Sequence, residues 1–187
     1  MRTADASILI IPGHLGAAED HWQSRWESKL KTAYRVEQSN WAAPVLADWI
    51  GALRSAVVSA RQPIVLVAHG LGVIAISHLV QSPALNGSVD AVAGAFMVAP
   101  VSDESIVADP RIDPSFAPTP RNRLPFHCHV IASSNDPLCA LPVAQAMAKD
   151  WGATVANAGD VGHIDPNSGH GPWPEGLMSF GGFLARL

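Results

Sequence analysis

The chain has 187 residues, of which 48% are hydrophobic, and a formal net charge of −4. This length predicts one domain over residues 1–187, because a domain usually holds roughly 100–200 residues. The small negative charge argues against a nucleic-acid partner, and apolar runs no longer than a strand argue against a membrane partner. Two isolated cysteines, and an N-terminus without a secretory signal, predict a cytoplasmic location.

Short apolar runs alternate with amphipathic segments along the chain. The runs predict six strands, at residues 7–12, 34–38, 63–69, 91–99, 126–133 and 153–157. Apolar residues at helical spacing predict helices at residues 20–30, 44–60, 71–81, 142–151 and 175–187, the last interrupted by Gly181 and Gly182. Such alternation predicts an α/β fold with a parallel sheet of about six strands and helices on both faces. The second strand is the most polar and is expected near an edge.

Residues 101–125 hold five prolines and are predicted to form a long ordered loop. This loop follows a buried strand, so we expect it to border a binding cleft at the carboxyl edge of the sheet. Chemistry in a parallel sheet collects at that edge. Four further loops therefore draw attention, after Pro12, at Gly70, after Ser133 and after Asn157.

The central feature of the sequence is the stretch from Pro63 to Ala75. Its apolar run ends in Ala68-His69-Gly70-Leu71-Gly72 and then resumes at helical spacing, which predicts a buried strand, a very tight turn and a helix. In α/β-hydrolases this turn has the pattern small-x-Ser-x-Gly and carries the nucleophilic serine. Gly70 occupies the serine position. Because the turn requires a strained backbone that glycine adopts without penalty, Gly70 is expected to stabilise it.

Two of the selected loops carry the remaining members of a catalytic triad. Asp136 follows the fifth predicted strand and His163 follows the sixth, so nucleophile, acid and histidine stand in the α/β-hydrolase order. The imidazole accepts a proton from the nucleophile, and the carboxylate fixes the imidazole tautomer and stabilises its charged form. Gly70, Asp136 and His163 are therefore the predicted catalytic positions.

Other groups are expected around these three positions. Backbone N–H groups are predicted to form an oxyanion hole, one from Leu71 and one from the loop at His14 and Leu15. The side chains expected to line the cleft are those of His69, Trp22 and Trp173.

Two other patterns, a candidate metal site and a candidate cysteine nucleophile, are less specific. His127 and His129 alternate along a strand, but no third ligand stands at a suitable spacing, so no metal site is predicted. Cys139 follows the acid loop and is interpreted as a buried structural residue rather than a nucleophile. No neighbour of Gly70 replaces the serine.

Several segments resemble a family of small cytoplasmic serine hydrolases that includes the vertebrate retinoblastoma-binding serine hydrolase. They are Asp20-His21-Trp22-Gln23-Ser24-Arg25-Trp26, Ala68-His69-Gly70-Leu71-Gly72, Ser134-Asn135-Asp136-Pro137, Gly162-His163-Ile164 and Ser168-Gly169-His170-Gly171-Pro172-Trp173-Pro174-Glu175-Gly176. The resemblance covers nearly the whole chain. It implies a compact α/β-hydrolase without a large cap domain and without a cofactor, with the triad positions at Gly70, Asp136 and His163.

The resemblance implies a carboxylic-ester or related acyl hydrolase that acts on a small molecule. Gly70, whether engineered or a natural loss, leaves little or no activity expected, because removing a triad serine costs about 10⁶ in turnover. Two alternatives remain open. The chain could be a non-catalytic pseudoenzyme that holds a small ligand or a protein partner in the same cleft, or a hydrolase in which His163 activates a water. The sequence does not specify an oligomeric state.

Overall fold

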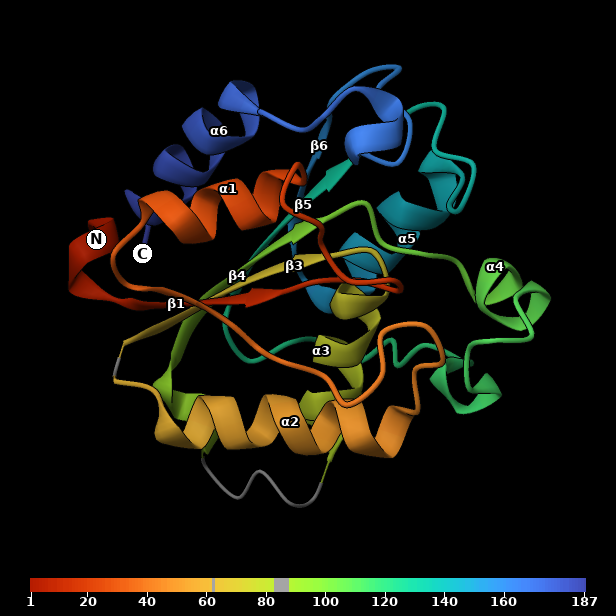
Figure 1. The fold of residues 1–187 in the computed structure, drawn as a ribbon, viewed down its shortest axis with the longest axis horizontal. Coiled ribbons are helices and arrows are strands. Elements are labelled where there is room, and N and C mark those ends of the chain that lie inside the picture. The colour runs from red at the N-terminus through yellow and green to blue at the C-terminus, as the bar shows by residue number, and fades with distance from the viewer. Residues whose placement is uncertain (62, 83–87) are drawn as a thin grey trace.

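Six parallel strands form the centre of the computed structural model, which describes residues 1–61, 63–82 and 88–187 (Figure 1). Their order across the sheet is β2-β1-β3-β4-β5-β6. The strands are β1 (Ser7–Ile11), β2 (Ala33–Arg35), β3 (Ile64–His69), β4 (Val92–Val98), β5 (His127–Ala132) and β6 (Thr154–Asn157).

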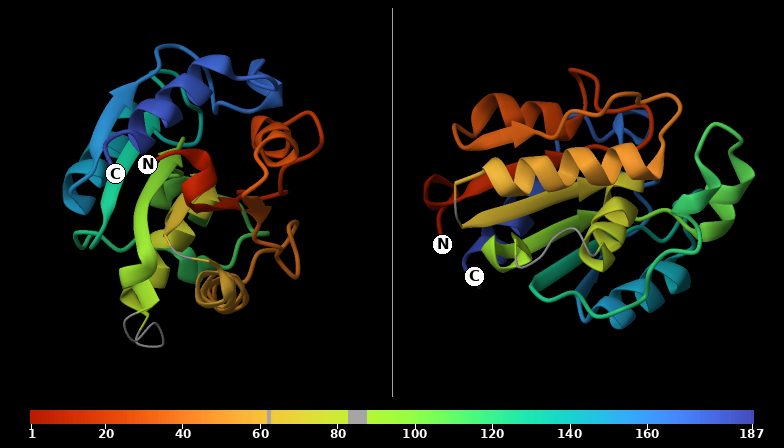
Figure 2. Two further views of the ribbon diagram at one scale, coloured as in Figure 1. Left: turned by 90° about the vertical axis from the view of Figure 1, so that its left-hand side faces the viewer. Right: turned by 90° about the horizontal axis from the view of Figure 1, so that it is seen from below.

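Helices cover both faces of the sheet (Figure 2). One face carries α2 (Leu46–Ser59), α3 (Leu71–Gln81) and α5 (Leu141–Trp151), and the other carries α1 (Trp22–Lys29) and α6 (Pro174–Leu184). A short helix, α4 (Asp103–Ala108), lies beyond the carboxyl end of β4 (Figure 1). The single-turn helices are η1 (Thr3–Asp5), η3 (Ser88–Ala91), η4 (Pro114–Phe116) and η5 (Pro166–Ser168).

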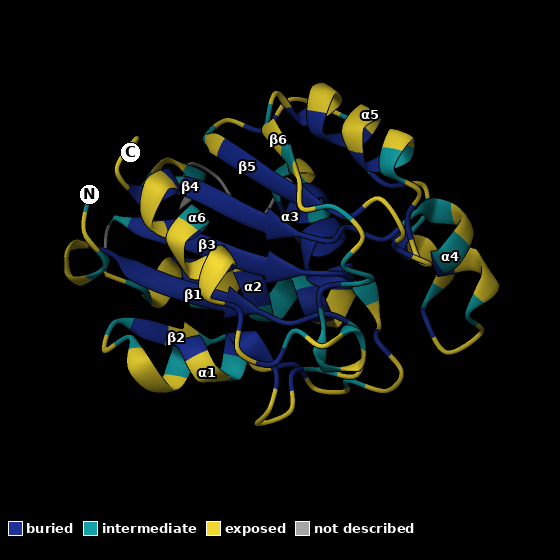
Figure 3. Ribbon diagram, turned by 90° about the horizontal axis from the view of Figure 1, so that it is seen from above, coloured by how far each residue is buried: buried dark blue, intermediate teal, exposed yellow. Residues whose placement is uncertain are grey.

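The sheet is buried on both faces, which explains why its central strands are continuous apolar runs. Along β3, Leu66 and Ala68 pack into the core beneath α2, α3 and α5, whereas Val65 and Val67 pack beneath α1 and α6. Figure 3 shows the strands as buried throughout their centre, while the outer faces of the helices are exposed. The predicted parallel sheet with helices on both faces is confirmed.

Two of the predicted elements differ from the structure by more than two residues at one end. The second strand is at the edge as expected, but it covers Ala33–Arg35 rather than residues 34–38, because it pairs with β1 over three positions only. The final helix is not interrupted at Gly181 and Gly182. Both glycines face solvent, and the buried Phe180 and Phe183 on either side of them hold the helix against the sheet.

The proline-rich segment is also more regular than predicted. It contains α4 and η4, so the expectation of a loop throughout residues 101–125 is wrong. Ser102 caps α4 by accepting a hydrogen bond from the Ser105 N–H (3.1 Å), and the first proline, Pro110, comes only after this helix ends. Within the described ranges, no helix has the length and apolar character needed to cross a membrane.

Candidate active site

The turn between β3 and α3 has an unusual backbone at Gly70, with φ 55° and ψ −123°. Residues with a side chain rarely adopt this conformation, and it costs them about 1–3 kcal/mol. Close packing also fixes the next turn of the chain, because a Cβ atom at Gly72 would lie 2.5 Å from the carbonyl oxygen of Ile11. The strand, tight turn and helix predicted from the sequence are therefore present, and glycine occupies the turn.

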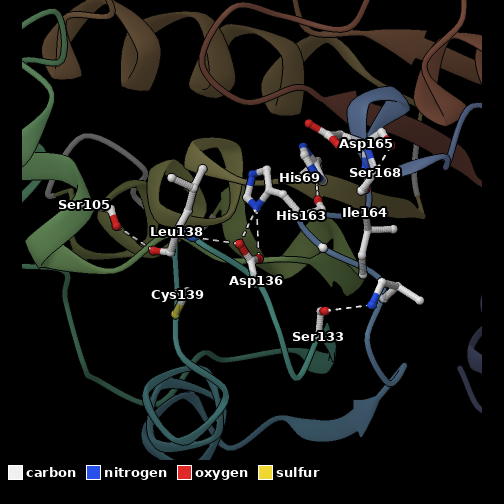
Figure 4. A network of polar contacts seen from close by, with 12 residues as sticks. His69, Ser105, Ser133, Asp136, Leu138, Cys139, His163, Ile164, Asp165 and Ser168 are labelled. Atoms are coloured by element: carbon white, nitrogen blue, oxygen red, sulfur yellow. Dashed lines mark hydrogen bonds and ion pairs between the residues drawn. The ribbon is translucent and has the colours of Figure 1, made fainter.

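Asp136 and His163 meet beside this turn (Figure 4). His163 Nδ1 lies 2.9 Å from Asp136 Oδ2 and 3.1 Å from Oδ1, and the Asp136 side chain is only 2% exposed. The Leu138 N–H also donates to Asp136 Oδ1 (2.9 Å). A carboxylate can only accept hydrogen bonds, so Nδ1 of His163 carries the proton and Nε2 of the neutral ring offers its lone pair.

The Nε2 atom of His163 faces Gly70. A Cβ atom built on Gly70 would have Nε2 as its nearest neighbour, at 3.2 Å. The structure thus brings together the three predicted catalytic positions from three separate loops. A serine side chain at Gly70 would place its hydroxyl against Nε2 after a shift of His163 by a few tenths of an ångström.

Ring N–H groups hold the loop that carries His163. His69 Nε2 donates to the carbonyl of His163 (2.8 Å), and Trp22 Nε1 donates to the carbonyl of Ile164 (3.0 Å). Ile164 has φ 52°, a rare conformation for a β-branched residue. Trp22 is fully buried, and the ring of Trp173 packs on it with the two ring centroids 5.2 Å apart. Neither indole lines the cavity, so the prediction that these two side chains line the cleft is wrong. The positions of these tryptophans in the sequence do not show whether an indole is buried in the core or lines the cleft.

A layer of two buried histidines, His21 and His69, lies behind His163. The ring centroids are 5.0 Å apart for His21 and His69, and 4.6 Å apart for His69 and His163. Burial lowers the pKa of His21 to about 4, and burial together with the neighbouring histidines holds the pKa of His69 well below its usual value. Both rings are therefore neutral near pH 7. His21 was not among the predicted site residues, although it belongs to one of the segments that resemble serine hydrolases.

Two backbone N–H groups are candidates for an oxyanion site beside Gly70. Leu71 is the first residue of α3, and the first N–H groups of a helix have no acceptor within it. The loop after β1 lies against this group, since a Cβ atom at Gly13 would be 3.1 Å from Leu71 N. Leu15 was wrongly included, because its N–H donates to the carbonyl of Trp41 (2.9 Å). The N–H of His14 has no acceptor among the described residues and remains a candidate.

A cavity of about 910 Å³ opens in front of Gly70, Leu71 and His163. One wall is apolar and comes mainly from the proline-rich segment and the acid loop, with Val101, Ile106, Ala108, Ile112 and Leu138. Polar side chains also line the cavity, namely those of Asp20, His21, Asp165 and Asn167. The prediction that the segment after β4 borders the cleft is confirmed.

Charged groups cross the rim of this cavity. Arg111 donates to Asp109 at 2.8 Å and 2.6 Å, and Asp109 Oδ2 lies 3.5 Å from Nδ1 of His14. These hydrogen bonds from Arg111 hold the pKa of the Asp109 carboxyl well below its usual range. These contacts therefore link the segment after α4 to the loop after β1.

Residues 8–181 match the family model described as serine hydrolase. This chain belongs to the serine hydrolase family. A YdeN-like hydrolase of Pectobacterium atrosepticum has 30% sequence identity and a TM-score of 0.82, over 97% of this chain and 91% of that one. The ydeN gene product of B. subtilis has 19% identity and a TM-score of 0.76, over 96% and 99% of the two chains. No curated protein sequence matches the chain.

The same fold occurs in Thermogutta terrifontis esterase 2, with 14% identity and a TM-score of 0.72 over 100% of this chain and 85% of that one. At this identity the likeness concerns the fold alone.

In this serine hydrolase family member, other hydroxyl and thiol groups are poorly placed to replace a serine. Ser105 is the one side-chain hydroxyl among the described residues that line the cavity, and it donates to the carbonyl of Leu138 (2.8 Å). Burial raises the pKa of both Cys128 and Cys139 to about 12, so they remain protonated thiols. His129 Nδ1 lies 2.7 Å from Thr154 Oγ1, which gives this ring a local partner within the sheet.

Proposed function

We propose that this protein binds small carboxylic esters or related acyl compounds in the cavity, and that Gly70 leaves it with little or no serine-hydrolase activity. The observation that carries this proposal is the Asp136–His163 pair, fully hydrogen-bonded and aimed at a glycine, with Nε2 3.2 Å from the position of a Cβ atom. The Pectobacterium relative, described as a hydrolase, supports the class of reaction.

The apolar residues that line the cavity suggest how an acyl compound would lie. An apolar acyl chain would pack against Ile106, Ile112 and Leu138, on the wall formed by the proline-rich segment and the acid loop. The N–H groups of Leu71 and His14 would receive the carbonyl oxygen. This chemistry needs neither metal nor cofactor, and the two free cysteines support a cytoplasmic location as part of the proposal.

The direct test is a comparison of three chains on 4-nitrophenyl esters from acetate to octanoate. The Gly70→Ser variant should hydrolyse these esters faster than the native chain, by up to about 10⁶-fold. The Gly70→Ala variant is the matched control, because it introduces the same backbone strain without a hydroxyl. A folded Gly70→Ser variant that is no faster than the native chain would contradict the proposal.

The second candidate function is a non-catalytic binding protein. Gly70 itself favours it, because the glycine relieves strain at the turn while leaving a cavity of about 910 Å³ in place. Calorimetric titration with an unreactive ketone analogue of each ester would test this candidate. Binding to the native chain, with no turnover after Gly70→Ser, is the result that it predicts.

A further inference from the structure

We infer that the native chain is itself a slow hydrolase, in which His163 activates a water molecule beside Gly70. The inference rests on the proposed function, because it places the same acyl compounds in the same cavity. It differs in assigning an activity to the chain with glycine, and it names aryl esters as the substrate class, since their leaving groups depart readily.

The space in front of Gly70 suits an oxygen atom. The Cβ position of a side chain at Gly70 lies 3.2 Å from His163 Nε2, so a water at the ordinary hydrogen-bond distance of about 2.8–3.0 Å from that nitrogen would lie beside this position, on the cavity side. The next atoms, His163 Cε1 and Gly13 Cα, are 3.8 Å and 3.9 Å from the same position. Because Gly70 carries no side chain and lines the same cavity as His163, a water that donates to Nε2 has room on the cavity side of the turn.

The state of His163 also suits a general base. Asp136 holds the proton on Nδ1, so the lone pair of Nε2 faces the position beside Gly70. His69 holds the carbonyl of His163, which keeps the ring from turning away. The His163 side chain is 14% exposed, which leaves it accessible from the cavity. A base in this position is within hydrogen-bond reach of the proton that it removes.

The reaction balances with water as the only co-reactant. His163 Nε2 takes one proton from the water while the water oxygen forms a bond to the carbonyl carbon, and the carbonyl electron pair moves onto its oxygen. The N–H groups of Leu71 and His14 stabilise that oxyanion. The bond from the carbon to the leaving oxygen then breaks, and Nε2–H returns the proton to the leaving group. The products are a carboxylic acid and a phenol, and no acyl-protein forms.

The experiment measures initial rates with 4-nitrophenyl acetate for the native chain and three variants. The native chain should exceed the His163→Ala variant by about 10²-fold or more, the contribution of a general base, because the oxyanion site and binding alone already give about 10³-fold over buffer. The rate should fall in D₂O, and intact-mass spectra taken during turnover should show no acetylated protein. Because the D₂O and mass measurements use the native chain, they do not depend on any variant folding.

The variants localise the water and its base. His163→Ala removes the base and Gly70→Ala places a methyl group against the water, so both should lower the rate to the residual that the oxyanion site and binding give alone. Gly181→Ala adds a methyl group on the exposed face of α6, outside the cavity, and should leave the rate unchanged. Thermal unfolding by circular dichroism establishes that each variant is folded.

The remaining outcomes overturn the inference in distinguishable ways. An acetylated native chain would mean a covalent nucleophile in place of the water. A native rate no higher than that of His163→Ala, together with faster turnover by the Gly70→Ser variant, would refute the water mechanism and leave the proposed function standing. If neither folded chain hydrolyses the ester, both proposals fail.

Discussion

The two halves of the site differ in what they retain. The acid–base half keeps its functional groups, with His163 Nδ1 2.9 Å from a nearly buried Asp136 carboxylate. The turn at Gly70 keeps only its backbone, with φ 55° and a hydrogen bond from the Gly70 N–H to the carbonyl of Val98 (3.0 Å). The comparison shows that the conformation of the turn does not depend on a serine. The packing of α3 against β1 at Gly72 imposes it.

The layer of His21 and His69 joins these halves. His69 precedes Gly70 in the chain and donates its Nε2–H to the carbonyl of His163 (2.8 Å). Because one neutral ring contacts both halves, a change that charges this layer should loosen the turn and the base together.

The largest expected effect is the loss of turnover when Asp136 is replaced in a chain that carries the serine. In a Gly70→Ser background, Asp136→Asn should lower kcat on 4-nitrophenyl esters by about 10⁴-fold, because an amide no longer fixes the proton on Nδ1. The asparagine oxygen can still accept from the Leu138 N–H, so the fold should persist. A loss below tenfold would mean that Asp136 does not orient His163.

A smaller effect is expected from the histidine layer. The pKa of His21 is lowered from 6.5 to about 4, so below pH 6.5 the unfolded chain binds more protons than the folded chain. Stability should therefore fall as the pH drops from 6.5 towards 4. His21→Asn keeps a hydrogen-bond acceptor that caps α1. Between pH 7.5 and 4.5, the free energy of unfolding of this variant should fall by about 2 kcal/mol less than that of the native chain, measured by urea unfolding. Parallel curves for the two chains would count against a buried neutral His21.

An effect of similar size concerns the backbone of the turn. Gly70→Ala should lower the free energy of unfolding by about 1–3 kcal/mol, because alanine is strained at φ 55°. Gly181→Ala makes the same chemical change on the exposed face of α6, with no atom within 4 Å of the new methyl group, and should raise stability by about 0.5–1 kcal/mol. Equal stability of the two variants in urea would show that the turn is not strained.

The sequence was most informative where a local pattern has one structural solution. Apolar runs buried on both faces predicted the central strands, and small residues around Gly70 predicted the tight turn. Asp136 and His163 were found because loops at one edge of a parallel sheet converge. Trp22 and Leu15 were misassigned, since their hydrogen bonds to the carbonyls of Ile164 and Trp41 join segments that only the folded chain brings together.

The central claim is that the site lacks its nucleophile and nothing else. Intact-mass spectrometry after exposure to a fluorophosphonate tests this claim most directly, because the reagent labels only a serine with an assembled base and oxyanion site. We predict one adduct on the Gly70→Ser variant, at the introduced serine, and none on the native chain. A folded Gly70→Ser variant that stays unlabelled, or a labelled native chain, would contradict the claim.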